Sequence, residues 1–162
     1  MNAPDRIIPA VGQPFEGGIF AGRFALGEQL YGLIVATADT GELGKTAWNA
    51  SKKKVAGALS YNDGRANTEA MLAAGSKLAK LARGLVIDGL DDWYLPSRLE
   101  ALVAFGELHD QDVFERDWYW TSTQYAGDAE FAWCQLFDYG GQLNSPKYYQ
   151  LRARAVRRFL IR

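Results

Sequence analysis

The chain has 162 residues, about the size of one domain, and its 48% apolar and 23% charged residues are ordinary for a globular protein and too apolar for a disordered one. Its 18 basic and 19 acidic side chains leave a net charge of −1, so there is no overall basic field to hold nucleic acid. One cysteine cannot form an intrachain disulfide, and one cysteine with one histidine disfavours a zinc site.

The N-terminal sequence predicts neither a signal peptide nor a membrane anchor. MNAPDRIIPA lacks an apolar core, and no apolar stretch of the chain approaches the roughly 20 residues that span a bilayer. Prolines at positions 4, 9 and 14 predict an extended arm over residues 1–16, followed by a single domain over residues 17–162. We therefore expect a protein that is made in the cytoplasm without membrane insertion.

The first elements of the predicted domain are two strands, over residues 19–25 and 29–36, on either side of Gly27 and Glu28. Turn residues between two apolar runs predict a β-hairpin. Residues 37–46 are predicted to be a loop, and residues 48–60 fit no single element.

Two helices follow. The first is predicted to begin with Asn67 as its N-cap and to end near Gly84, because small and apolar residues recur at helical spacing between them. The second begins at Ser97, which forms a capping box with Glu100, and extends to about residue 108.

Short strands dominate the rest of the chain, at residues 118–123, 131–137 and 151–159, with a turn at 139–141. In the strand 131–137, the two-residue period places Trp133, Gln135 and Phe137 toward the core, and Cys134 and Leu136 toward solvent or a partner. A hairpin, then two helices, then several strands predicts an α+β fold.

Charge is distributed unevenly along the sequence. Residues 86–138 contain 12 acids and two bases, whereas residues 147–162 contain six bases and no acid. Because these bases alternate with apolar residues, we expect a final strand whose arginines pair with carboxylates such as Asp91, Asp92 or Glu100. A nucleic-acid surface is the less favoured interpretation.

The residues that suggest catalysis lack partners. His109 lies in a polar segment with no other histidine, and Cys134 has no identifiable base beside it. Asp88, Asp91 and Asp92 offer oxygen ligands for a cation, but they lack the regular spacing of a calcium loop and are better explained as turn residues. We therefore predict no enzyme, no metal and no cofactor.

Several motifs in chain order resemble the family of the C-terminal domain of Legionella collagen-like adhesins. They span roughly residues 17–160 and comprise the segments 64–68 (GRANT), 92–97 (DWYLPS, followed by Glu100), 120–124 (WTSTQ), Ala132-Trp133 with Phe137, and 151–158 (LRARAVRR). The order makes the match more specific than any one motif. We expect Trp93, Pro96, Trp120 and Trp133 to be core and turn residues.

This resemblance implies a C-type-lectin-like fold, with two helices packed on a short, twisted, mainly antiparallel sheet. It also implies a phage, prophage or bacterial-surface setting, in which some relatives diversify the stretch that corresponds to residues 124–150 here. The candidate ligand-binding residues in that stretch are Tyr125, Asp128, Glu130, Cys134, Leu136, Asp138, Tyr139, Leu143, Asn144, Tyr148 and Tyr149. The sugar-binding calcium motifs of lectins are missing, and so is the cysteine pair of formylglycine-generating enzymes.

The function expected from these features is recognition. The protein would be a non-enzymatic phage or prophage virion protein, associated with the tail or displayed on the particle, that binds a host-surface glycan or protein receptor. The tyrosines would act as flat anchors, as they do in antibody loops. The alternative is a structural assembly or decoration subunit that binds other virion proteins, and in either case we expect a homo-oligomer.

Overall fold

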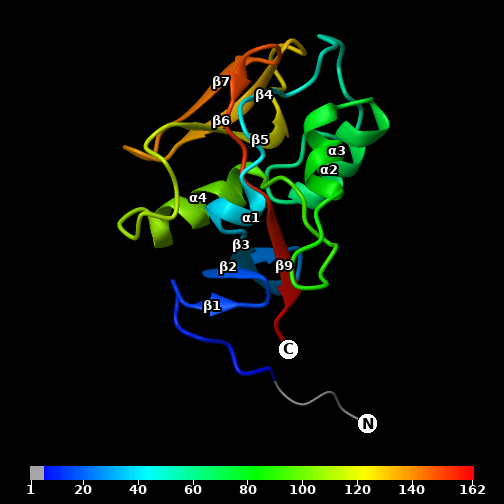
Figure 1. The fold of residues 1–162 in the computed structure, drawn as a ribbon. Coiled ribbons are helices and arrows are strands. Elements are labelled where there is room, and N and C mark those ends of the chain that lie inside the picture. Colours follow the sequence, from blue (N-terminus) through cyan, green and yellow to red (C-terminus); the bar gives the residue numbers. More distant parts are fainter. Residues whose placement is uncertain (1–5) are drawn as a thin grey trace.

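The computed structural model describes residues 6–162, which form four helices and nine strands arranged as an α+β fold (Figure 1). This confirms the predicted α+β class, although the structure has four helices and three sheets instead of two helices on one sheet. The helices are α1 (Ala38–Gly41), α2 (Gly64–Ala73), α3 (Lys77–Arg83) and α4 (Arg98–Leu108). The strands are β1 (Pro14–Phe15), β2 (Gly18–Leu26), β3 (Gln29–Val35), β4 (Thr46–Ala47), β5 (Trp118–Gln124), β6 (Phe131–Leu136), β7 (Gln142–Pro146), β8 (Gln150–Leu151) and β9 (Val156–Leu160).

The predicted hairpin is confirmed as β2 and β3, which form a four-stranded antiparallel sheet in the order β1-β2-β3-β9. Leu26 pairs with Gln29 across the turn, where Gly27 has a positive φ of 62°. The predicted final strand is in fact two strands, because β8 pairs with β4 and β9 pairs with β3. The C-terminal segment therefore joins two sheets.

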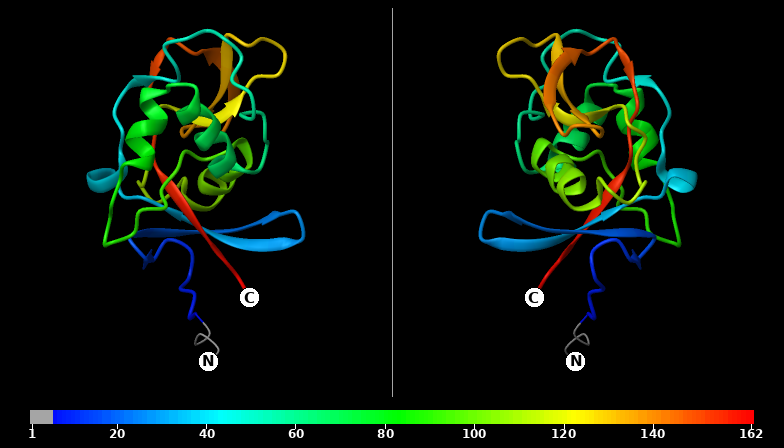
Figure 2. Two further views of the ribbon diagram at one scale, coloured as in Figure 1. Left: turned by 90° about the vertical axis from the view of Figure 1, so that its right-hand side faces the viewer. Right: turned by 90° about the vertical axis from the view of Figure 1, so that its left-hand side faces the viewer.

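The remaining sheet has the order β5-β6-β7 and is also antiparallel. The sequence predicted β5 and β6 and the turn after them but missed β7, whose sequence QLNSP has no apolar alternation. This sheet lies at one end of the molecule, and β1 and the C-terminal end of β9 lie at the other (Figures 1 and 2).

The predicted first helix is two helices. Gly75, with a φ of 83°, and the Ser76 N-cap of α3 interrupt it, and α2 begins earlier than predicted, with Asp63 as its N-cap. Asn67 is buried inside α2, where its side chain bonds the backbone N–H and C=O of Ser60. A helical apolar stripe continues through such a break, so periodicity alone did not show it. The capping box at the start of α4 is confirmed.

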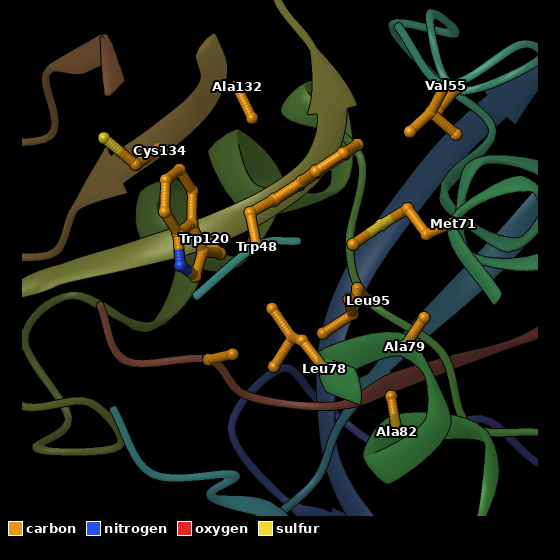
Figure 3. Packing of buried hydrophobic residues seen from close by; sticks show 12 residues of the cluster. Trp48, Val55, Met71, Leu78, Ala79, Ala82, Leu95, Trp120, Ala132 and Cys134 are labelled. Atoms are coloured by element: carbon orange, nitrogen blue, oxygen red, sulfur yellow. The ribbon is translucent and has the colours of Figure 1, made fainter. Parts of the chain in front are cut away.

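Three tryptophans lie in the core with satisfied indole N–H groups. Trp48, Trp93 and Trp120 are at most 1% exposed, and each ring N–H donates to a backbone carbonyl. Figure 3 shows the cluster in which Trp48 and Trp120 pack against side chains from α2, α3 and β6. Pro96 is buried as predicted, but Trp133 is only half-buried.

The predicted N-terminal arm lies against the body over its described part. The Gly12 N–H donates to the Phe20 carbonyl, and Ile8, Val11 and Phe15 pack on the core cluster around Phe20. Residues 1–5 of the predicted arm lie outside the described residues. Within the described part, no helix has the length and apolar character needed to cross a bilayer.

Candidate functional site

The hairpin of β6 and β7 separates the predicted binding residues into two groups. At one end Phe131 pairs with Pro146, and the Lys147 N–H donates to the Glu130 carbonyl over 2.9 Å. At the other end the strands close through the turn around Tyr139. Because β6 has six residues, these ends lie about 20 Å apart along the strand. The structure therefore does not bring Asp138 and Tyr139 together with Tyr148 and Tyr149.

The end of the hairpin at residues 125–130 and 146–149 carries an exposed aromatic group. Tyr148 and Tyr149 are 53% and 48% exposed and meet edge to face, with ring centroids 5.2 Å apart. The Lys52 ammonium lies 5.1 Å from the Tyr148 ring centroid. We call Tyr148 and Tyr149 the tyrosine pair.

Acidic residues and a third tyrosine lie at the same end. Asp128 and Glu130 are exposed, although the Asp128 carboxylate also accepts a hydrogen bond from the Glu130 N–H. Tyr125 is half-buried, with its ring against the edge of Trp133 at a centroid distance of 5.4 Å. This end therefore combines aromatic surface with hydrogen-bond acceptors.

The turn end is different in character. Tyr139 is 86% exposed, and Gly140 follows it with a φ of 83° against the Phe105 ring. Asp138 and Leu136 are half-buried, and Leu143 is exposed on the edge strand β7.

The prediction that Cys134 faces solvent or a partner is wrong. It is 3% exposed, and its thiol donates to the Leu143 carbonyl, so it is not available as a ligand contact (Figure 3). Burial raises the pKa of this thiol to about 12, which makes it a poor nucleophile. The core side of β6 carries Ala132 and Cys134 because Trp48 and Trp120 already fill the space there, so only small side chains fit. Trp133 is half-buried and is covered by the Arg98 guanidinium, whereas Gln135 and Phe137 are buried as predicted.

The other residues considered for catalysis or metal binding have structural surroundings. His109 is exposed, with its ring stacked on Phe105. Asp88 has a φ of 51° in the turn between Ile87 and Leu90. Arg157 holds the Asp92 carboxylate at 2.7 and 3.1 Å, and the pKa of Asp92 is lowered despite partial burial. Residues 6–162 contain no group of three or more His, Cys, Asp or Glu side chains arranged to hold a metal ion.

The C-terminal arginines form ion pairs, as predicted, but mostly with other partners. Only Asp92 was named correctly, and Glu100 is not an arginine partner. Its buried carboxylate accepts from the Gly64 and Ser97 N–H groups and the Tyr94 hydroxyl, while burial raises its pKa. The pairs are Arg152 with Asp117 and Glu42, Arg154 with Glu42, Arg157 with Asp92 and Glu16, and Arg158 with Asp63.

Two cations near the β6–β7 hairpin were missed by the sequence reasoning. The Arg98 guanidinium lies 3.6 Å from the Trp133 ring centroid. Lys147 is fully buried above Trp48, and its Nζ donates to the Lys53 carbonyl and to Gln124. Both contacts join residues far apart in the chain, so no local signal in the sequence could have shown them.

No model of a known protein family matches the chain, and no curated protein matches it either. The family resemblance of the motifs therefore stays a prediction.

Proposed function

We propose that this protein is a non-enzymatic phage or prophage virion protein, associated with the tail or displayed on the particle, which binds a host-surface glycan or protein receptor through the end of its β6–β7 hairpin that carries the tyrosine pair. We further propose that its α+β architecture is a C-type-lectin-like fold. The resemblance of the motifs supports the virion setting and the fold family. The exposed tyrosine pair supports the binding role.

The tyrosine pair is the observation that carries the proposal. Two neighbouring phenol rings that are about half exposed offer apolar contact area and hydroxyl groups at little cost in conformational entropy. Pro146 and the buried Lys147 hold the chain immediately before the pair. The tyrosines are therefore presented from an ordered base, as recognition requires.

The chemistry of the candidate nucleophile favours binding over catalysis. The Cys134 thiol is buried, with its pKa raised to about 12, and it donates a hydrogen bond to a backbone carbonyl. The proposed role therefore uses the surface of the hairpin and no covalent step.

The test is the binding of fluorescently labelled protein to a panel of bacterial strains and to a glycan array. The double variant Tyr148→Ala/Tyr149→Ala should lose at least tenfold in apparent affinity, because it removes both rings. Tyr139→Ala is the control, since it removes an even more exposed ring at the other end of the hairpin, away from the tyrosine pair, and should bind as the wild type does. Absence of wild-type binding to every strain and glycan, or full binding by the double variant, would contradict the proposal.

The second candidate is a structural subunit that binds other virion proteins or further copies of itself. The observation in its favour is Ile7, whose side chain is 90% exposed on the N-terminal segment. Light scattering after size exclusion should then show an oligomer that Ile7→Asp dissociates. A monomer at all concentrations would contradict self-assembly through this residue.

A further inference from the structure

Arg98 differs from the other arginines that the fold buries wholly or in part. Each of the others lies within 4.0 Å of a carboxylate, whereas no carboxylate within residues 6–162 lies that close to Arg98. The paired arginines are Arg83, Arg152, Arg154, Arg157 and Arg158. Burial also lowers the pKa of Arg98, so the fold holds this cation partly out of water without an anion to balance it.

Neighbouring side chains fix the plane of the Arg98 guanidinium. It lies 3.6 Å from the Trp133 ring centroid and 5.1 Å from that of Tyr61. Its Nε donates to Gln142 Oε1 over 2.9 Å, and Gln142 in turn donates to the Arg98 carbonyl and to buried Gln135. The group is therefore oriented before any ligand arrives.

The two terminal nitrogens of Arg98 remain available. Within the described chain, Nε makes the side chain's only hydrogen bond, which leaves the N–H groups of Nη1 and Nη2 unused. A guanidinium edge with two parallel donors matches the two oxygens of a carboxylate. The terminal nitrogens of Arg98 are therefore suited to bind an anion of this shape.

We propose that Arg98, Tyr61 and Trp133 form a binding site for a sugar that carries a carboxylate, such as a uronic or sialic acid. This inference rests on the proposed receptor-binding function and names the class of ligand. Arg98 binds the carboxylate through its terminal nitrogens, and the 45%-exposed ring of Tyr61 packs against the apolar C–H face of the sugar.

The surroundings favour a sugar over an acidic peptide. Asn144 lies directly opposite Trp133 in the β6–β7 register, so it shares that face of the sheet, and it is exposed. Its amide offers both a donor and an acceptor to hydroxyl groups. The Tyr125 ring also contacts Trp133, with centroids 5.4 Å apart. A single fixed cation among aromatic and amide groups suits one carboxylate on a polyhydroxylated ring better than a run of acidic side chains.

The test is titration of the protein with glucuronic acid and N-acetylneuraminic acid, followed by ligand-observed NMR, with glucose and a hexaglutamate peptide as comparison probes. Wild-type protein should bind at least one acidic sugar at least tenfold more tightly than glucose and the peptide. Arg98→Gln should weaken that binding at least tenfold, and Arg98→Lys should weaken it severalfold, because lysine keeps the charge but lacks the paired donors.

Arg23→Gln is the matched control, because Arg23 is exposed on β2 and has no carboxylate within 4.0 Å in the described chain. It should bind as the wild type does. Equal binding of glucose, preference for the peptide, or full binding by Arg98→Gln would overturn the inference. If the acidic sugars do not bind while wild-type protein still binds cells through the tyrosine pair, the inference fails and the proposed function stands.

Discussion

The cationic side chains of β9 are paired with carboxylates, whereas those around the β6–β7 hairpin are not. On β9, Arg157 and Arg158 are paired with Asp92, Glu16 and Asp63. Around the hairpin, Arg98 and Lys147 are held by aromatic rings, amides and carbonyls, with no carboxylate in an ion pair within the described chain.

This difference separates charges that stabilise the fold from charges that can take part in recognition. When a buried cation is paired with a carboxylate, its charge is compensated, and removal of the carboxylate lowers the free energy of unfolding. A cation that is oriented by rings and amides keeps donors for a ligand, as Arg98 does. The following variants test that division, in order of decreasing effect.

Glu42→Gln should produce the largest loss of stability. Arg154 is 2% exposed on its side chain and donates to Glu42 over 2.8 Å, so this substitution leaves a buried guanidinium without its counter-charge. We expect a loss of about 3 kcal/mol in the free energy of unfolding, measured by urea denaturation at pH 7. A loss below about 1 kcal/mol would show that the carbonyls of Ala36 and Val113 suffice for Arg154.

Asp92→Asn should have a smaller effect, of about 2 kcal/mol at pH 7, because Arg157 keeps its contact with Glu16. The pKa of Asp92 is lowered from 3.8 in the folded state, so its contribution is present above that pH and is lost as the pH falls through the lowered value. The difference between variant and wild type should therefore shrink in acid. A difference that is independent of pH would contradict an ionic contribution.

Lys147→Met should change how stability depends on alkaline pH. Burial lowers the pKa of Lys147 from 10.5 to about 8, so between pH 8 and 9 the unfolded chain binds more protons at this position than the folded chain. The free energy of unfolding of the wild type should therefore rise by about 1 kcal/mol relative to the variant over that interval. Urea denaturation at both pH values measures this. The same change in the free energy of unfolding for both proteins would show that the pKa of Lys147 is not lowered.

Arg98→Gln should cost about 1 kcal/mol at pH 7, well below the loss for Glu42→Gln, because it removes stacking on Trp133 and the hydrogen bond to Gln142 but leaves no carboxylate of the described chain without a partner. Urea denaturation of this variant beside Glu42→Gln makes the contrast direct. Equal losses would mean that Arg98 stabilises the fold as much as Arg154 does, which would contradict the distinction between the two regions.

Local signals explain what was predicted correctly. Turn residues between two apolar runs defined the β2–β3 hairpin, and the Ser97–Glu100 capping box defined the start of α4. These features depend on residues within a few positions of each other. The break between α2 and α3, by contrast, depends on Gly75 and Ser76 within an apolar stripe that continues across it.

The errors in the candidate site came from long-range packing. In β6 the prediction was correct for Gln135 and Phe137, which are buried, and wrong for Cys134, which packs beside Trp48 and Trp120, where only small side chains such as Ala132 and Cys134 fit. The division of the predicted binding residues into two groups followed from β7, whose polar residues gave no strand signal.

The sequence by itself determined the α+β class, the hairpin and the α4 cap, because each is fixed by contacts between residues close together in the chain. Only the tertiary structure decided which cations are neutralised. Ion pairs such as Arg154 with Glu42, and stacking such as Arg98 on Trp133, join residues from distant elements. The numbers of acidic and basic side chains are nearly equal, and the fold determines which cations have no carboxylate partner.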